Sequence, residues 1–112
     1  MTIRQTQLIA PIQLTNAVAT YLTAPVNTTY RIGRAAFSNP TGGAVTVTVY
    51  LVPAAGAAGV ANEIVNAVNV AAGSTYVSPE LAGQVLPPGS TLQALASAGA
   101  SIVLYASGVS IQ

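Results

Sequence analysis

Five side chains that perform much of protein chemistry are missing from this sequence: His, Cys, Asp, Lys and Trp. Without His and Cys, the chain cannot assemble a Ser-His-Asp or Cys-His catalytic device, nor a zinc site built on those ligands. Without Lys it has no Schiff-base amine, and without Cys it has no disulfide framework from which to read a redox compartment. These absences predict a protein that is not an enzyme and that holds no cofactor and no metal ion.

Charge is also scarce. Only 4% of the 112 residues are charged, 52% are hydrophobic, and the formal net charge is +1, whereas ordinary soluble domains are about one quarter charged. Three arginines in total are too few for the extended basic groove of a nucleic-acid-binding protein. The long uncharged runs are cut by Pro and Gly before they reach the roughly 20 apolar residues of a membrane-spanning helix. We therefore expect neither a nucleic-acid nor a membrane partner, whereas a near-neutral surface favours association between proteins.

The two carboxylates, Glu63 and Glu80, are in principle enough for glycoside hydrolysis. A sugar-cleaving site also needs aromatic platforms, and the chain has only five Tyr and one Phe. A structural role is the simpler interpretation, because Glu80 follows Pro79 in a turn. There it would accept hydrogen bonds from backbone N–H groups or pair with Arg31 or Arg34.

The clearest pattern in the chain is the alternation in Val45–Val52, which predicts a β-strand. One face would join the core and contains Val45, Val47, Val49 and Leu51. The other face is uncharged and contains Thr46, Thr48, Tyr50 and Val52. Such a face is either covered by a neighbouring chain or wetted only by hydroxyl groups.

Other strands follow from similar patterns and from turn residues. A strand from about Tyr30 ends in the turn "SNPTGG", which predicts a hairpin with the strand at 45–52. Further strands are predicted before Pro25, near Ser90–Ala96, and at the C-terminal end, where Gly108 indicates a bulge or bend. The segment at 63–70 fits a strand better than its alternative, a short helix capped by Asn62.

About seven or eight short antiparallel strands, with a turn signal roughly every ten residues, predict an all-β protein. We expect one β-sandwich or jelly-roll-like domain over residues 16–112, preceded by an N-terminal arm or edge strand over residues 1–15. The N-terminal segment alternates weakly and contains Pro11. Its candidate contacts with a neighbouring chain are Ile3, Arg4, Leu8 and Ile9.

Residues 21–111 resemble small virion proteins of tailed bacteriophages. The shared elements are the Tyr-x-x-Ala-Pro opening at Tyr21–Pro25, a strand closed by Asn39, the alternating Thr/Val strand, and Leu-x-x-Gly-Ser-x-Leu at Leu86–Leu92. Such proteins often have Gly-Asp where this chain has Gly89-Ser90, so one possible turn-capping carboxylate is missing.

The resemblance implies a head decoration (cement) protein that stabilises the phage capsid by bridging neighbouring subunits of the major capsid protein. Such proteins are commonly trimeric, so a homotrimer in the virion, assembled in the host bacterial cytoplasm, is expected. Alternatives are a neck, tail or fibre-associated protein, and a surface module that binds a receptor or carbohydrate through loops 53–62 and 83–90. The candidate subunit-interface residues are Thr46, Thr48, Tyr50, Val52, Arg31 and Arg34.

Overall fold

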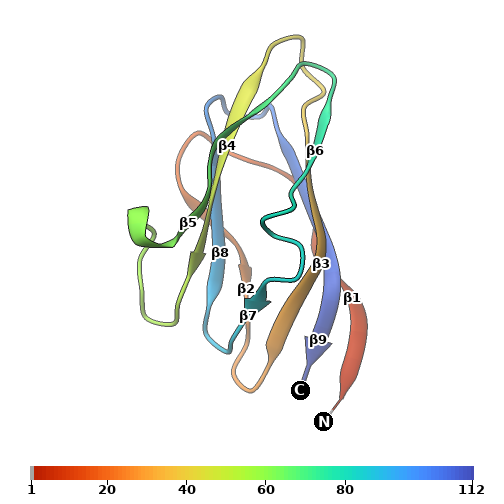
Figure 1. Cartoon of the computed structure of the whole chain (residues 1–112), viewed down its shortest axis with the longest axis vertical. Coiled ribbons are helices and arrows are strands. Elements are labelled where there is room, and N and C mark those ends of the chain that lie inside the picture. The colour runs from red at the N-terminus through yellow and green to blue at the C-terminus, as the bar shows by residue number, and fades with distance from the viewer. Residues whose placement is uncertain (1) are drawn as a thin grey trace.

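The computed structural model describes residues 2–112, which form two antiparallel sheets packed face to face (Figure 1). Sheet A has the strand order β1 (Ile3–Gln13), β9 (Val103–Ile111), β3 (Thr29–Ser38) and β6 (Thr75–Val77), and β7 (Val85–Leu86) also pairs with β3. Sheet B has the order β2 (Ala19–Thr23), β8 (Thr91–Ala96), β4 (Val45–Val52) and β5 (Glu63–Val70), and a single 3-10 turn, η1 (Val60–Asn62), precedes β5. The predicted all-β sandwich is confirmed, with nine strands in this range rather than seven or eight.

The strand order is that of a jelly roll. The chain forms one long hairpin whose two arms pair along their length: β4 with β5 at the closed end, then β3 with β6 and β7, β2 with β8, and β1 with β9. Rolling this hairpin places its successive pairs alternately in the two sheets. No helix within residues 2–112 is long and apolar enough to cross a membrane.

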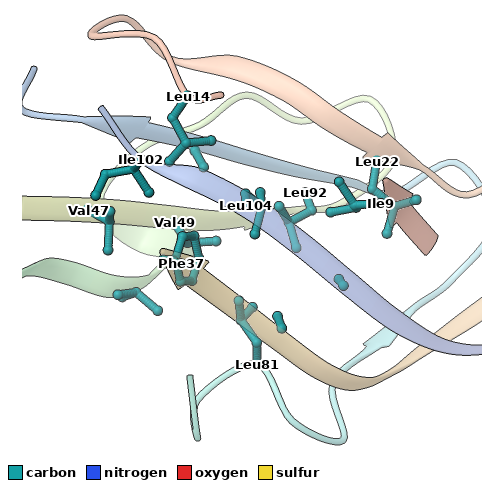
Figure 2. Packing of buried hydrophobic residues seen from close by; sticks show 14 of the residues in the cluster. Ile9, Leu14, Leu22, Phe37, Val47, Val49, Leu81, Leu92, Ile102 and Leu104 are labelled. Atoms are coloured by element: carbon teal, nitrogen blue, oxygen red, sulfur yellow. The ribbon is translucent and has the colours of Figure 1, made fainter. Parts of the chain in front are cut away.

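The core fills the space between the two sheets (Figure 2). Alternate residues of the central strands point inward, so Val47 and Val49 of β4 and Leu104 of β9 are fully buried. Leu81, in the segment between β6 and β7, is also fully buried, and Phe37 stacks on Tyr76 with ring centroids 6.2 Å apart. Each such large side chain contributes about 1.5–3 kcal/mol of gross hydrophobic stabilisation.

The N-terminal segment, predicted as an arm or an edge strand, forms the edge strand β1 of sheet A. It pairs with β9 from Ile3 opposite Ile111 to Gln13 opposite Val103. Thr2 and Gln112 exchange two further backbone hydrogen bonds of 2.7 and 2.8 Å, so the two chain ends lie side by side (Figure 1).

The predicted hairpin between β3 and β4 is wrong, because the two strands lie in different sheets. The turn at residues 39–44 crosses from sheet A to sheet B, which turns Phe37 and Val47 toward the same core. Pro and Gly in "SNPTGG" permit a reversal of direction but do not determine whether the following strand pairs or crosses. Crossing is favoured because it buries the apolar face of both strands.

The buried side chain of Asn39 holds this crossing in place. Its Nδ2 donates to the carbonyl oxygens of Gly43, at 2.8 Å, and of Val70, at 2.9 Å. Its Oδ1 accepts from the N–H and the hydroxyl of Thr41, at 3.1 and 2.6 Å. One fully buried amide thereby joins the turn to the end of β5 and uses all of its polar atoms.

Residues 63–70 form the strand β5, as predicted in preference to a helix. The strand contains a register shift, because Val47 pairs with Val68 whereas Val49 pairs with Val65. At this bulge Ala67 has a φ of +47°, and its N–H donates to Oγ1 of Thr48 at 3.1 Å. The Ala67 N–H, which the bulge removes from the backbone hydrogen bonds between β4 and β5, thus still has a hydrogen-bond partner.

Candidate functional site

The six predicted interface residues do not form one surface. Thr46, Thr48 and Tyr50 alternate with the buried valines of β4, and so lie on the outer face of sheet B. Arg31 and Arg34 belong to β3 and are exposed on sheet A, in the opposite layer. The fold therefore separates the uncharged strand face from the two arginines.

The outer face of sheet B carries amide, hydroxyl and apolar groups in adjacent rows. Thr48 is opposite Leu95 of β8, and Tyr50 is opposite Gln93 of β8 on one side and Glu63 of β5 on the other. All five of these side chains are half-buried, and one of them, Glu63, is charged. This face can bury area against a partner while removing few charges from water, and removing charges from water is the expensive part of binding.

The prediction for Val52 is wrong, because this side chain is only 2% exposed. At the end of β4 the chain turns at Pro53, and Val52 lines a hollow of about 190 Å³ together with Leu86 and Pro87. The loops 53–62 and 83–90 meet here, since a Cβ on Gly89 would lie 3.0 Å from the Cβ of Ala54. Their closure over the strand end makes Val52 a packing residue.

The predicted contacts of the N-terminal segment divide in a similar way. Ile3 is 60% exposed and Arg4 is also exposed, so both can reach a neighbouring chain. Leu8 is half-buried against the core, and Ile9 is 4% exposed and opposite Ala106 of β9. Ile9 is thus wrongly predicted as a contact residue, because an edge strand of a sandwich turns alternate side chains into the core.

Sequence reasoning missed the hollow on the outer face of sheet A in which Arg31 lies. Its volume is about 570 Å³ and it is lined by Gln5, Thr6, Arg31, Gly33, Ser107, Gly108 and Val109. A second hollow of about 250 Å³ adjoins it through Ser107 and is lined also by Gln7, Arg34, Tyr105 and Ala106. The sequence signals for this region were Arg31 and Arg34, predicted as interface residues, and Gly108, which predicted a bulge or bend in the last strand.

The bulge lies opposite Gly108, in β3. Ile32 pairs with Gly108 and Arg34 pairs with Ser107, so Gly33 is the extra residue. Close approach of the two backbones requires glycine at 108, because a Cβ there would lie 2.0 Å from the carbonyl oxygen of Arg31. At Gly33 itself a Cβ would make only ordinary contacts of 3.5 and 3.6 Å.

Glu80 does not pair with Arg31 or Arg34 but accepts hydrogen bonds from the hydroxyls of Tyr76 and Ser78, the latter at 3.1 Å. The hydrogen bond from Tyr76 lowers the pKa of Glu80 below its usual value, while partial burial and then Glu80 itself raise the pKa of Tyr76. These bonds fix the start of the segment that carries Leu81 into the core. The role of Glu80 seen here is structural.

Within residues 2–112 no three His, Cys, Asp or Glu side chains gather into a group that could hold a metal ion. The two carboxylates lie apart in the architecture, with Glu63 on β5 of sheet B and Glu80 in the segment that joins β6 to β7 beside sheet A.

Two solved structures share the fold of this chain. A chain in the structure of infectious bursal disease virus, Gx strain, superposes with a TM-score of 0.54 at 19% identity over 99% of this chain. A chain of the Gt strain of the same virus superposes with a TM-score of 0.51 at 13% identity over 97%. This chain spans 32% of the length of each viral chain. No protein-family model and no curated protein sequence matches it. The likeness therefore identifies a jelly-roll fold that a virus also uses.

Proposed function

We propose that this protein is a structural component of a virion, and that it stabilises the particle by binding between neighbouring shell subunits. The observation that carries the proposal is the superposition of nearly the whole chain, 99%, on a chain of a virus. Jelly rolls also occur in lectin domains and cupins. The scarcity of catalytic side chains and of charge favours the structural role among these, and the proposal includes no enzymatic activity.

At the finer level, the proposed role is decoration of a bacteriophage head, after assembly in the host cytoplasm, by a homotrimer bound to the major capsid protein. A stable interface covers about 800 Å² on each partner, or about one seventh of the 5609 Å² that this chain exposes. The outer face of sheet B is the surface we assign to the contact between copies. Its side chains at Thr48, Tyr50, Gln93 and Leu95 are half-buried and uncharged, so a second copy would cover them at little desolvation cost.

Native mass and imaging of particles test the proposal. The purified protein should be an oligomer in solution, trimeric by preference, and should appear at repeated positions on the head. Tyr50→Arg places a charge in the centre of the sheet B face and should reduce retention on particles more than tenfold. The control Val26→Arg adds the same charge at a loop position that is 82% exposed, and it should leave retention unchanged.

A monomer at all concentrations that also fails to bind particles would refute the proposal. Density at a single vertex or along the tail would instead favour a neck, tail or fibre protein.

One observation favours a second candidate, the binding of a receptor or carbohydrate. The loops 53–62 and 83–90 meet around the hollow of about 190 Å³ that contains Val52. The lining is mostly apolar and offers Ser90 and Thr91 as hydroxyl-bearing residues. Binding on a glycan array that is lost in Thr91→Val would support this candidate, and a blank array would remove it.

A further inference from the structure

The bulge at Gly33 brings two arginines onto one face of sheet A. In a regular strand, residues three positions apart point to opposite faces, so Arg31 and Arg34 would be separated by the sheet. Here Gly33 is the extra residue, and the partners of the two arginines on β9 are Val109 and Ser107. These partners are two positions apart and share a face. Arg31 and Arg34 therefore both reach the outer face.

The two arginines lie along one depression, which we call the arginine trough. It consists of the hollows of about 570 and 250 Å³ that share Ser107. The register aligns its lining in two rows across β1, β9 and β3. One row contains Gln5, Val109 and Arg31, and the next contains Gln7, Ser107 and Arg34.

The guanidinium groups of the trough are hydrogen-bond donors, and neither glutamate among residues 2–112 pairs with them. Among residues 2–112, the two hydroxyls that bind Glu80 are those of Tyr76 and Ser78, and Glu63 lies on the other sheet. Neither Arg31 nor Arg34 takes part in any of the side-chain hydrogen bonds of this part of the chain. Guanidinium groups bind carboxylates through two parallel N–H···O bonds, so an oxyanion is the matching ligand.

The spacing of the rows matches an extended peptide. Residues two apart on an antiparallel strand are separated by about 6.8 Å, and this is also the separation of alternate side chains in any extended segment. An extended segment with carboxylates at positions i and i+2 could place one beside Arg31 and the other beside Arg34, with Gln5 and Gln7 available on the far side. A single small oxyanion would use one row only.

We propose that the arginine trough binds an extended acidic segment of a neighbouring protein, with Asp or Glu at alternate positions. The proposal deepens the proposed function and rests on it for the source of the segment, which is a subunit of the shell. The outer face of sheet B supplies contact area between copies, whereas the trough recognises the charge pattern of a different chain.

Binding of a synthetic peptide tests the trough directly. The probe is an eight-residue peptide with Glu alternating with Thr, labelled for fluorescence polarisation, and the matched control peptide replaces every Glu by Gln. Arg31→Gln and Arg34→Gln should each weaken binding of the acidic peptide about three- to tenfold. Arg4→Gln removes the same charge from a residue that lines neither hollow, and it should leave binding within twofold. Circular dichroism should show that the three variants fold like the unsubstituted protein.

Three results would overturn the proposal, and a fourth separates it from the virion role. Equal binding of the Glu and Gln peptides, or equal loss in Arg4→Gln, would mean that the trough does not recognise carboxylates. Competition by inorganic phosphate at the affinity of the peptide would identify a site for a small oxyanion. Preference for a sulfated oligosaccharide would identify a glycan site. Peptide binding by a protein that is absent from particles would leave the trough in place and refute the virion role, whereas the reverse result would refute the trough alone.

Discussion

Replacing Gly108 by Ala tests the physical basis of the arginine trough. The added Cβ would lie 2.0 Å from the carbonyl oxygen of Arg31, 2.9 Å from the backbone N of Gly33 and 3.0 Å from the carbonyl carbon of Arg31. All three atoms are backbone atoms of β3, so no side chain can rotate away. Strands β9 and β3, which pair from Thr29 to Ser38, must separate locally by about 1 Å.

The cost of this separation can be estimated from two contributions. Overpacking inside a well-packed region costs about 1–3 kcal/mol. Stretching one or two ladder hydrogen bonds beyond useful length costs about 1 kcal/mol each. The expected loss is therefore about 2–5 kcal/mol, against a total unfolding free energy of about 6–17 kcal/mol for a chain of this length.

Urea unfolding followed by circular dichroism measures the effect. With a urea dependence of about 2 kcal/mol per M, the midpoint for Gly108→Ala should fall by about 1–2.5 M. The matched control is Gly33→Ala in the same bulge, where the new Cβ makes only ordinary contacts, and its midpoint should move by less than about 0.5 M. An unchanged midpoint in Gly108→Ala, or equal losses in both variants, would refute the close approach of β9 and β3.

Three further predictions concern side-chain hydrogen bonds at the turn after β3, at the bulge of β5 and in the segment after β6. Asn39→Ala removes every bond of the buried amide and should lower the unfolding free energy by about 2–4 kcal/mol, measured by urea; a loss below 1 kcal/mol would contradict the role of this side chain. Thr48→Val removes the acceptor of the Ala67 N–H, so that amide should exchange with deuterium faster while amides of β9 keep their rates. Because folding lowers the pKa of Glu80, its contribution to stability is present above the unfolded pKa of about 4.3 and is lost as the pH falls through the folded pKa. Glu80→Gln should therefore flatten the dependence of the urea midpoint on pH below about 5, and an unaltered pH profile would contradict the assignment.

The sequence predicted most of the strands because their alternation depends on neighbouring residues alone. Val45, Val47 and Val49 are buried as predicted, and the alternating residues Ile102, Leu104 and Ala106 form a second buried row near the C-terminal end. Each of these positions is fixed by the period of two in a pleated strand. This alternation within a strand is the same whichever other strand pairs with it.

The sequence did not predict how the strands pair, because pairing is decided by contacts between residues that are far apart in the chain. The turn after β3 contains the residues of a hairpin, yet β4 belongs to the other sheet. The amide of Asn39 reaches Val70, 31 positions away. Nothing near position 39 indicates that partner, since an Asn before Pro is a common turn residue in either arrangement.

The two sides of a strand are equally hard to assign where the backbone is irregular. Alternation counted across Gly33 would place Arg31 and Arg34 on opposite faces, and the bulge reverses that result. Gly108 marked the region, but the extra residue is in the partner strand and not in its own. A glycine in a strand therefore indicates close approach of another backbone without indicating which of the two strands carries the extra residue.

The few charged side chains of this protein are distributed unequally between the two sheets, and this gives the two outer faces different roles in binding. All three arginines lie on strands of sheet A, whereas Glu63 lies on β5 of sheet B. Charge complementarity contributes more to the orientation and selectivity of an association than to its strength. The outer face of sheet B carries Thr46, Thr48 and Tyr50. It can bury area at little desolvation cost, but it does little to fix the orientation of a partner. In an assembly, the uncharged face of sheet B would hold copies of this chain together, and the arginines of sheet A would orient each copy on a subunit of the shell. Neutralising the arginines should therefore disturb the placement of the subunit on a shell before it disturbs association between copies.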